Sequence, residues 1–155
     1  MLEIPADPAT WTSQELAFGL ALAADELKAE GVCVLGVQEL LYVTDYFVLA
    51  TTQSARQTKA LADGLNEVAK KALGHKGRVE GSQRSSWLLI DLGNVVVHVL
   101  TEDAREFYGL DELWADADRY EITPEGEEPP ADAEAATIDS VDYEARAEAE
   151  GDETV

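Results

Sequence analysis

Apolar residues recur at helical spacing in two segments of the chain. Residues 12–15 form a capping box, and the apolar stripe that follows them is expected to end at Gly31. Residues 54–57 repeat the capping pattern, and Gly74 closes the second segment. The stripes consist of Leu16, Leu20, Ala23, Ala24 and Leu27 in the first segment and Leu61, Leu65, Val68 and Ala72 in the second. The spacing therefore predicts two amphipathic helices.

Short runs rich in β-branched and aromatic residues predict strands. Three of these runs span residues 32–37, 46–51 and, as a short strand, 78–80. The clearest signal comes from residues 87–92 and 95–100, because Gly93-Asn94 between them favours a two-residue hairpin turn. Residues 38–45 fit either a loop or a strand.

The two-residue turn fixes which residues of this hairpin lie opposite each other. On one face the pairs are aliphatic, namely Leu92 with Val95, Ile90 with Val97 and Leu88 with Val99. On the other face the pairs are mixed, namely Asp91 with Val96, Leu89 with His98 and Trp87 with Leu100. The aliphatic face is expected in the core, and the mixed face is expected to be partly available for contact.

Two helical turns are predicted after the hairpin. Thr101 caps a short helix that ends at Gly109, and Asp111 begins a further turn. The order of the elements indicates one α/β domain over residues 12–120, with a mixed β-sheet and flanking helices, after a flexible lead of residues 1–11.

Charge separates the C-terminal part of the chain from the rest. The 155 residues include 11 Lys and Arg and 32 Asp and Glu, for a net charge of -21. Residues 121–155 hold 13 of the acids and 1 of the bases, and they contain few large apolar residues. This segment is predicted to be an acidic disordered tail. No basic cluster with interleaved aromatic residues is visible, which argues against a simple nucleic-acid binder.

Candidate chemistry is sparse. Cys33 lies in an apolar run, where it acts as a small buried hydrophobe, and this favours a reducing compartment. Cys33, His75 and His98 are not at metal-ligand spacing, so no metal and no cofactor are expected. His98 is interpreted as a hydrogen-bonded structural histidine. The N-terminus lacks the basic region of a signal peptide and no apolar run could span a membrane, so a cytoplasmic protein is expected.

One catalytic pattern is partly present. Nucleotidyltransferases of the polymerase-β type place a Gly-Ser pair shortly before a strand that bears two carboxylates at alternate positions. Gly81-Ser82 and Asp91 resemble this pattern, but Gly93 stands at the second carboxylate position. Without that carboxylate, a pair of magnesium ions lacks its bridge. The sequence therefore favours a protein without enzyme activity, and no catalytic residue is assigned.

Three blocks of the chain are distinctive in combination. They span residues 44–57, 87–99 and 105–114, with Glu80-Gly81 between the first two. Together they resemble the ribosomal silencing factor family, RsfS, also called Iojap, over about residues 20–118. The resemblance implies a nucleotidyltransferase-like α/β fold without the catalytic carboxylates. It also implies a translation repressor that docks on protein fourteen of the large ribosomal subunit and sterically blocks joining of the small subunit when nutrients are scarce.

A surface that binds a basic ribosomal protein should combine aromatic anchors with acidic residues. The expected partner-binding residues are Trp87, Asp91, His98, Glu106, Tyr108, Leu110, Asp111 and Trp114. Phe107 and Leu113 belong to the same cluster, but they are the members expected to pack inward.

Two alternatives from other classes remain open. The first is a metal-dependent nucleotidyltransferase that uses Asp91 and a carboxylate not identified in the sequence. The second is a self-associating module, because the exposed hairpin face could pair with a second copy of the chain. The resemblance also allows a homodimer.

Overall fold

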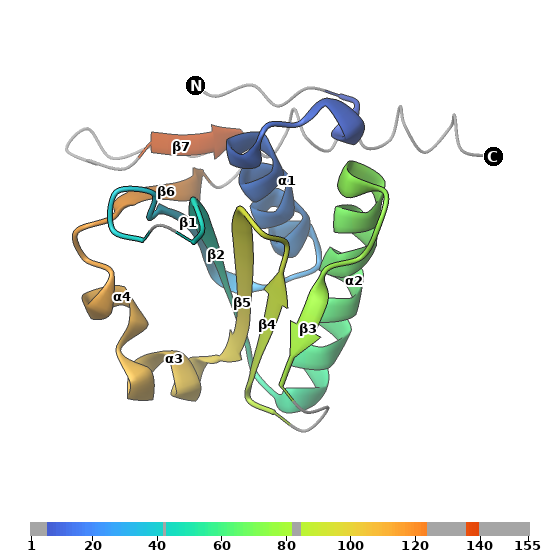
Figure 1. Ribbon diagram of the computed structural model, residues 1–155. Helices are drawn as coiled ribbons and strands as arrows, with labels where there is room; N and C mark the ends of the chain where they lie inside the picture. Colours follow the sequence, from blue (N-terminus) through green and yellow to red (C-terminus); the bar gives the residue numbers. More distant parts are fainter. Residues whose placement is uncertain (1–5, 42, 82–84, 124–135, 140–155) are drawn as a thin grey trace.

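The computed structural model of the protein describes residues 6–41, 43–81, 85–123 and 136–139 (Figure 1). In chain order the elements are the 3₁₀ turn η1 (Pro8–Thr10), α1 (Ser13–Glu26), β1 (Glu30–Gly36), β2 (Tyr46–Thr52), α2 (Ala55–Leu73), β3 (Arg78–Glu80), β4 (Trp87–Asp91), β5 (Val95–Thr101), α3 (Glu102–Tyr108), α4 (Leu110–Leu113), β6 (Asp118–Thr123) and β7 (Ala136–Asp139).

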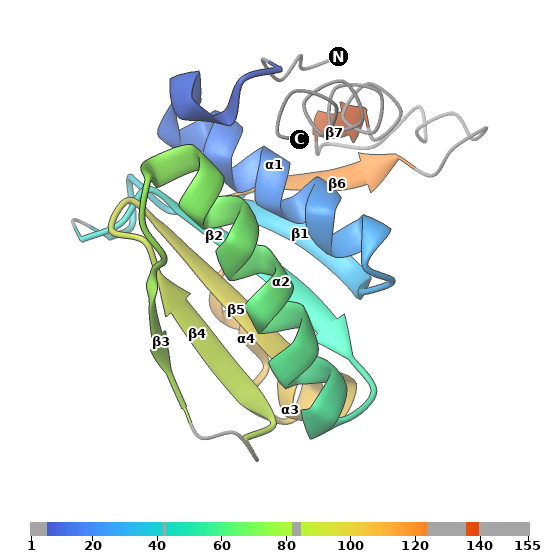
Figure 2. The same cartoon turned by 90° about the vertical axis from the view of Figure 1, so that its right-hand side faces the viewer.

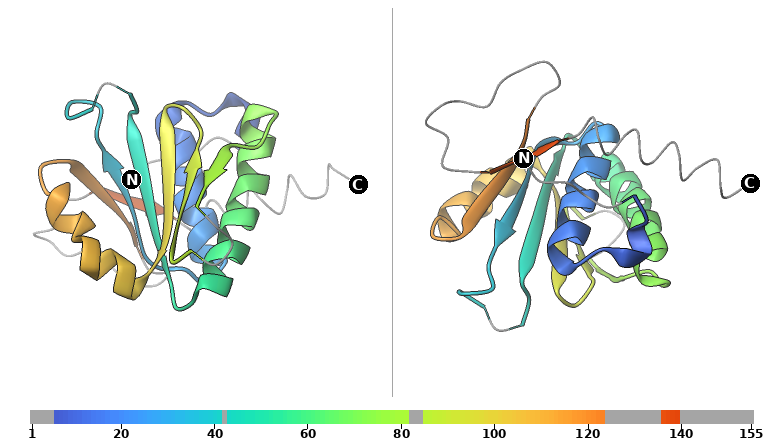
Figure 3. Two further views of the ribbon diagram at one scale, coloured as in Figure 1. Left: turned by 60° about the horizontal axis from the view of Figure 1, so that its bottom comes forward. Right: turned by 90° about the horizontal axis from the view of Figure 1, so that it is seen from above.

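The described strands form one seven-stranded sheet in the order β3-β4-β5-β2-β1-β6-β7. The pairs β2–β5 and β6–β7 are parallel, and the other neighbouring pairs are antiparallel. The long helices α1 and α2 lie together on one face of the sheet (Figure 2). The short helices α3 and α4 lie on the opposite face (Figure 3). The fold is therefore the predicted α/β domain with a mixed sheet and flanking helices.

Helix α1 begins as predicted but ends earlier. The Thr12 amide donates to Glu15 Oε1 at 2.9 Å, and the Glu15 amide donates to Thr12 Oγ1 at 3.2 Å, which completes the capping box. The helix stops at Glu26, because Lys28 takes the left-handed conformation at φ 72° that closes its last turn. The prediction that Gly31 ends the helix is wrong, since Gly31 lies within β1.

Helix α2 follows its predicted boundaries. Ser54 Oγ accepts a hydrogen bond from the Gln57 amide at 3.1 Å, and Gly74 ends the helix. The Gln57 side chain bonds to the Gln53 amide at 2.8 Å rather than to Ser54. The Gln57 side chain therefore accepts from the amide of the residue before the N-cap, instead of from the amide of the N-cap residue itself.

The β4–β5 hairpin has the predicted register, with Trp87 opposite Leu100 and Asp91 opposite Val96. Gly93 adopts φ 86°, the region that glycine occupies without a steric penalty. The aliphatic face of the hairpin is buried against α1 and α2, as expected. Residues 38–45 form a loop rather than a strand, and Tyr42 lies outside the described residues.

Two apolar clusters fill the two sides of the sheet. The larger one packs the sheet against α1 and α2. The smaller one lies under α3 and α4 and contains Cys33, Phe47, Leu100 and Leu110 among its buried members. Cys33 is fully buried, as expected, and this burial raises the pKa of its thiol. The mixed face of the hairpin is therefore partly covered by the two short helices.

The C-terminal part of the chain differs from the prediction. Residues 121–155 are expected to be a disordered tail, but β6 continues to Thr123 and pairs with β1, and residues 136–139 form β7. The alternating residues Tyr120 and Ile122 of β6 pack against the larger cluster. The Tyr120 ring lies edge-on to Phe18, with ring centroids 5.0 Å apart. The sheet thus extends past residue 120, and the rest of the expected tail lies outside the described residues. No helix in the described part of the chain is long and apolar enough to cross a bilayer.

Candidate functional site

The short helices α3 and α4 form a bent two-helix segment at the end of β5. Thr101 Oγ1 accepts a hydrogen bond from the Ala104 amide at 3.2 Å, which fixes the start of α3 as predicted. Gly109 ends α3 at φ 59°, a left-handed conformation that redirects the chain into α4. Local sequence signals therefore set the position of this bend.

Large apolar side chains of this segment face solvent. Phe107 is 82% exposed, Leu113 is 64% exposed and Tyr108 is 53% exposed. The expectation that Phe107 and Leu113 pack inward is wrong. We call Trp87, Glu106, Phe107, Tyr108 and Leu113 the α3–α4 surface.

The orientation of both helices has a common cause. In α3 the buried residue is Ala104, and the next residue, Arg105, turns its side chain inward. In α4 the buried residue is Leu110, and the next residue, Asp111, turns inward to meet Arg105. Because successive helix positions are about 100° apart, the residue two positions after an inward-turned side chain lies on nearly the opposite side of the helix. Phe107 and Leu113 occupy those positions.

A series of aromatic contacts connects the interior to this surface. Trp114 packs edge-on against Phe47 with centroids 5.2 Å apart, and Phe47 packs against His98 at 4.7 Å. His98 lies 5.8 Å from Trp87, and Trp87 lies 4.9 Å from Tyr108, which packs against Phe107 at 5.1 Å. The exposed rings of α3 are thus supported by rings in the smaller cluster.

His98 is a structural residue in this series. It is buried, and its Nδ1 accepts a hydrogen bond from the Trp87 indole nitrogen at 3.2 Å. Burial lowers the pKa of His98 to about 4, so the ring is neutral near pH 7. The interpretation of His98 as a hydrogen-bonded structural histidine is confirmed.

The other residues expected to bind a partner occupy different depths. Glu106 is exposed on α3, and Trp87 and Asp91 are half-buried on β4. Leu110 is buried, and Trp114 is half-buried against the smaller cluster. Asp111 is held by Arg105 and Arg119, and the hydrogen bonds from Arg105 keep the pKa of its carboxyl well below the ordinary value. The structure therefore brings seven of the predicted residues together around α3 and α4, some at the surface and others beneath it, whereas Asp91 lies at the other end of β4, beside the hairpin turn.

Asp91 has a local role in the hairpin. Its Oδ1 accepts a hydrogen bond from the Gly93 amide at 2.9 Å, and its Oδ2 lies 3.7 Å from Arg78. Across the described residues, no group of three or more His, Cys, Asp or Glu side chains is arranged to hold a metal ion. Ser82 of the nucleotidyltransferase-like pattern lies outside the described residues.

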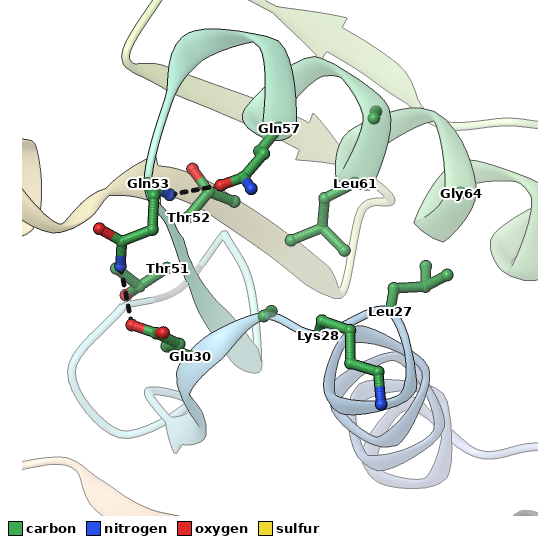
Figure 4. Close-up of a pocket in the computed structure, with 11 residues that line it drawn as sticks. Leu27, Lys28, Glu30, Thr51, Thr52, Gln53, Gln57, Leu61 and Gly64 are labelled. Carbon is green, nitrogen blue, oxygen red and sulfur yellow. Dashed lines mark hydrogen bonds between the residues drawn. The ribbon is translucent and has the colours of Figure 1, made fainter.

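A separate pocket of about 280 Å³ opens between the end of α1 and the start of α2 (Figure 4). Its polar side chains bond to one another. The Gln53 side chain donates to Glu30 Oε2 at 2.8 Å, and the Gln53 amide donates to Gln57 Oε1. None of the residues predicted to bind a partner lines this pocket.

Sequence reasoning missed Arg105 as a determinant of the site. Its side chain is only 11% exposed and touches residues far apart in the sequence, including the carbonyl oxygen of Gly31 and Thr51 Oγ1. An arginine in a short, otherwise acidic helix gives no periodic signal for such contacts. The one available signal was the pair of opposite charges at positions 105 and 111.

Comparison with known proteins places the chain in context. A family model described as "Ribosomal silencing factor during starvation" matches residues 10–149. The protein named "Ribosomal silencing factor RsfS" from Halalkalibacterium halodurans is 38% identical over 111 residues, which cover 72% of this chain and 95% of that protein. The protein of the same name from Bacillus subtilis is 36% identical over 97 residues, covering 63% of this chain and 82% of that protein.

The fold is also similar to a solved structure. The crystal structure of a protein from Chromobacterium violaceum matches with a TM-score of 0.60 and 27% sequence identity, covering 79% of this chain and 94% of that one. The range matched by the family model runs past residue 120, as the sheet does.

Proposed function

The chain belongs to the family of ribosomal silencing factors, and from this membership we propose that it binds protein fourteen of the large ribosomal subunit and blocks joining of the small subunit. The proposed result is lower translation when nutrients are limited, in the cytoplasm. The proposed mechanism is steric, because a folded domain seated on the joining face of one subunit occupies space that the other subunit needs.

The observation that supports this proposal is the exposure of Phe107, Tyr108 and Leu113 on one two-helix segment. Exposed aromatic groups that rest on a packed base are typical anchors of protein interfaces. Acidic side chains accompany them, since the same two helices also expose Glu102, Asp103, Glu106 and Glu112. An apolar centre with an acidic rim suits a basic protein partner.

The eight predicted partner-binding residues contribute in two ways under this proposal. Trp87, Asp91, Glu106 and Tyr108 offer exposed or half-buried atoms to the partner. The other four stand behind them, and these are His98, Leu110, Asp111 and Trp114. Phe107 and Leu113 join the first group because of their exposure.

The experiment that tests the proposal is sedimentation of the purified protein with separated large and small ribosomal subunits. We expect stoichiometric migration with the large subunit alone. Adding both subunits at limiting magnesium should then give fewer joined ribosomes than a reaction without the protein. Migration with neither subunit would overturn the proposal.

The catalytic alternative has its own test. Magnesium-dependent turnover of a nucleotide that disappears in an Asp91→Asn variant would support a nucleotidyltransferase. We expect no turnover by either protein, because the Asp91 carboxylate is engaged by the Gly93 amide and Gly93 supplies no second carboxylate.

We also propose that a homodimer, if it forms through the α3–α4 surface, competes with ribosome binding. Apparent affinity for the large subunit should then fall as protein concentration rises through the range in which the dimer forms. Equal affinity across that range would show that the two associations use different surfaces.

A further inference from the structure

We propose that the Arg105–Asp111 ion pair, extended by Arg119, is the positioning element of the α3–α4 surface. It fixes the rotation of both short helices, so that Phe107 and Leu113 face the partner. This inference rests on the proposed function for the identity of the partner, but its structural part can be tested without the ribosome.

Arg105 joins four elements through one guanidinium group. Its Nε and Nη2 donate to the two carboxylate oxygens of Asp111 at 2.8 and 2.7 Å, which links α3 to α4 in a bidentate pair. Its Nη1 donates to the carbonyl oxygen of Gly31 in β1 and to Thr51 Oγ1 in β2, the latter at 2.9 Å. The planar fork of arginine allows these contacts together, and a lysine ammonium could not reproduce them.

Asp111 extends the network to the C-terminal strand. Its Oδ1 also accepts a hydrogen bond from Arg119 Nη1 in β6 at 2.8 Å, and Arg119 Nε donates to Glu121 at 2.8 Å. One carboxylate on α4 is therefore bound by guanidinium groups from α3 and β6. Because its charge is neutralised within the protein, Asp111 offers little attraction to a basic partner, and its role is positional.

Apolar contacts alone do not account for the observed rotation. Each short helix buries a single residue, Ala104 in α3 and Leu110 in α4. Rotating α3 about its axis so that Phe107 faced the sheet would bury this side chain. Phe107 is much larger than Ala104, so its burial would contribute more hydrophobic free energy. That rotation would carry the Arg105 guanidinium away from its partners in β1, β2 and α4, at the cost of its charge-assisted hydrogen bonds. The ion pair therefore decides the orientation against the hydrophobic preference.

The test compares Asp111→Asn and Arg105→Lys with the matched control Asp63→Asn. The control removes the exposed Lys59–Asp63 ion pair of α2, which lies on the other face of the sheet. Amide hydrogen exchange is measured first, on the free proteins. We expect faster exchange in α3 and α4 for both network variants, with unchanged exchange in α2 and β5 and no effect of the control. Unchanged exchange in α3 and α4 would overturn the inference.

Affinity for purified large subunits is measured next, alone and with Phe107→Ala in each background. We expect Asp111→Asn and Arg105→Lys to bind about tenfold more weakly than the wild type, as a lost preorganisation predicts. Phe107→Ala should then cost about tenfold in the wild type and less than about threefold in the network variants, because they no longer present Phe107.

The outcomes separate the two proposals. Equal effects of Phe107→Ala in all backgrounds would show that the network stabilises the fold without presenting this side chain, and would overturn the inference. Failure of the wild-type protein to bind large subunits would overturn the proposed function, while the hydrogen-exchange result would still decide whether the ion pair orients the helices. If Asp111→Asn does not fold, Arg105→Lys retains the positive charge and carries both measurements.

Discussion

The indole N–H of Trp87 on β4 donates a hydrogen bond to Nδ1 of His98 on the neighbouring strand β5, at 3.2 Å. Because Nδ1 accepts this bond, the proton of the neutral ring is on Nε2. Protonation of Nδ1 would place two donors opposite each other and would charge a buried ring. The packing of Trp87, and with it the base of Tyr108, therefore depends on a neutral His98.

The first prediction is that His98 makes the protein less stable in mild acid. The pKa of His98 is lowered from 6.5 to about 4 in the folded protein, so the unfolded chain binds this proton more readily. The resulting stabilisation is complete above about pH 6.5 and is lost as the pH falls from there to about 4. Between pH 7 and pH 5, we expect the free energy of unfolding to fall by about 2 kcal/mol on account of His98.

Denaturant unfolding of the wild type and of His98→Asn at a series of pH values measures this effect. The Asn side chain can accept the Trp87 bond but does not titrate in this range, and the carboxyl groups are common to both proteins. The difference between the two stability curves should appear between pH 4 and pH 6.5. Parallel curves would contradict a lowered pKa.

The second prediction concerns the exposed rings of α3. Phe107→Ala and Tyr108→Ala should each weaken binding to the large subunit by about 1–3 kcal/mol, the range found for aromatic anchors at interfaces. Because Phe107 is 82% exposed, its truncation should change the free energy of unfolding by less than about 0.5 kcal/mol. Val79→Ala, at an exposed apolar position on β3, is the matched control and should bind normally. Normal binding by both α3 variants would show that the partner uses another surface.

The third prediction concerns the rate of association. Glu106→Lys reverses a charge on the acidic rim and should slow association with the large subunit about tenfold at low salt, with less effect at high salt. Asp25→Lys makes the same charge change near the end of α1 and controls for net charge. Stopped-flow association rates at two salt concentrations distinguish a local effect from a global one. Equal slowing by both variants would mean that only net charge matters.

The fourth prediction concerns the backbone conformation of Gly93 in the hairpin turn. Outside residues 92–94, no atom lies within 4 Å of the position that a Cβ would take at Gly93, whose φ is 86°. Gly93→Ala therefore meets no clash and should lower the free energy of unfolding by about 1 kcal/mol through conformation alone. Gly93→Asn should cost less, since asparagine tolerates this conformation better. Thermal unfolding of both variants gives the comparison, and an equal loss in the two would point to a cause other than φ.

Much of the fold could be predicted because local signals determine it. The hairpin register follows from the two-residue turn at Gly93-Asn94, and the limits of α2 and α3 follow from Ser54, Gly74, Thr101 and Gly109. These signals act within a few residues and do not depend on tertiary contacts. The end of α1 was not predicted, because Lys28 adopts the left-handed conformation that glycine usually adopts at the end of a helix.

The orientation of the α3–α4 surface could not be predicted in the same way. Helices of seven and four residues are too short for hydrophobic periodicity to define a face. The deciding contacts join Arg105 to Gly31 and Thr51, and such pairings between distant residues become visible only in the fold. Strand β6 was missed for a related reason, since its charged residues alternate with Tyr120 and Ile122 directly before a segment rich in proline and acid.

Strand β3 forms the edge of the sheet next to β4, and only three residues of it are available for pairing. The exposed Val79 lies between Arg78 and Glu80, whose side chains pair with each other at 2.7 Å. A strand from another molecule that approached this edge would find a short template flanked by charge. Polymerisation by edge-to-edge addition is therefore disfavoured here, even though β3 has no neighbouring strand on its outer side in the described sheet.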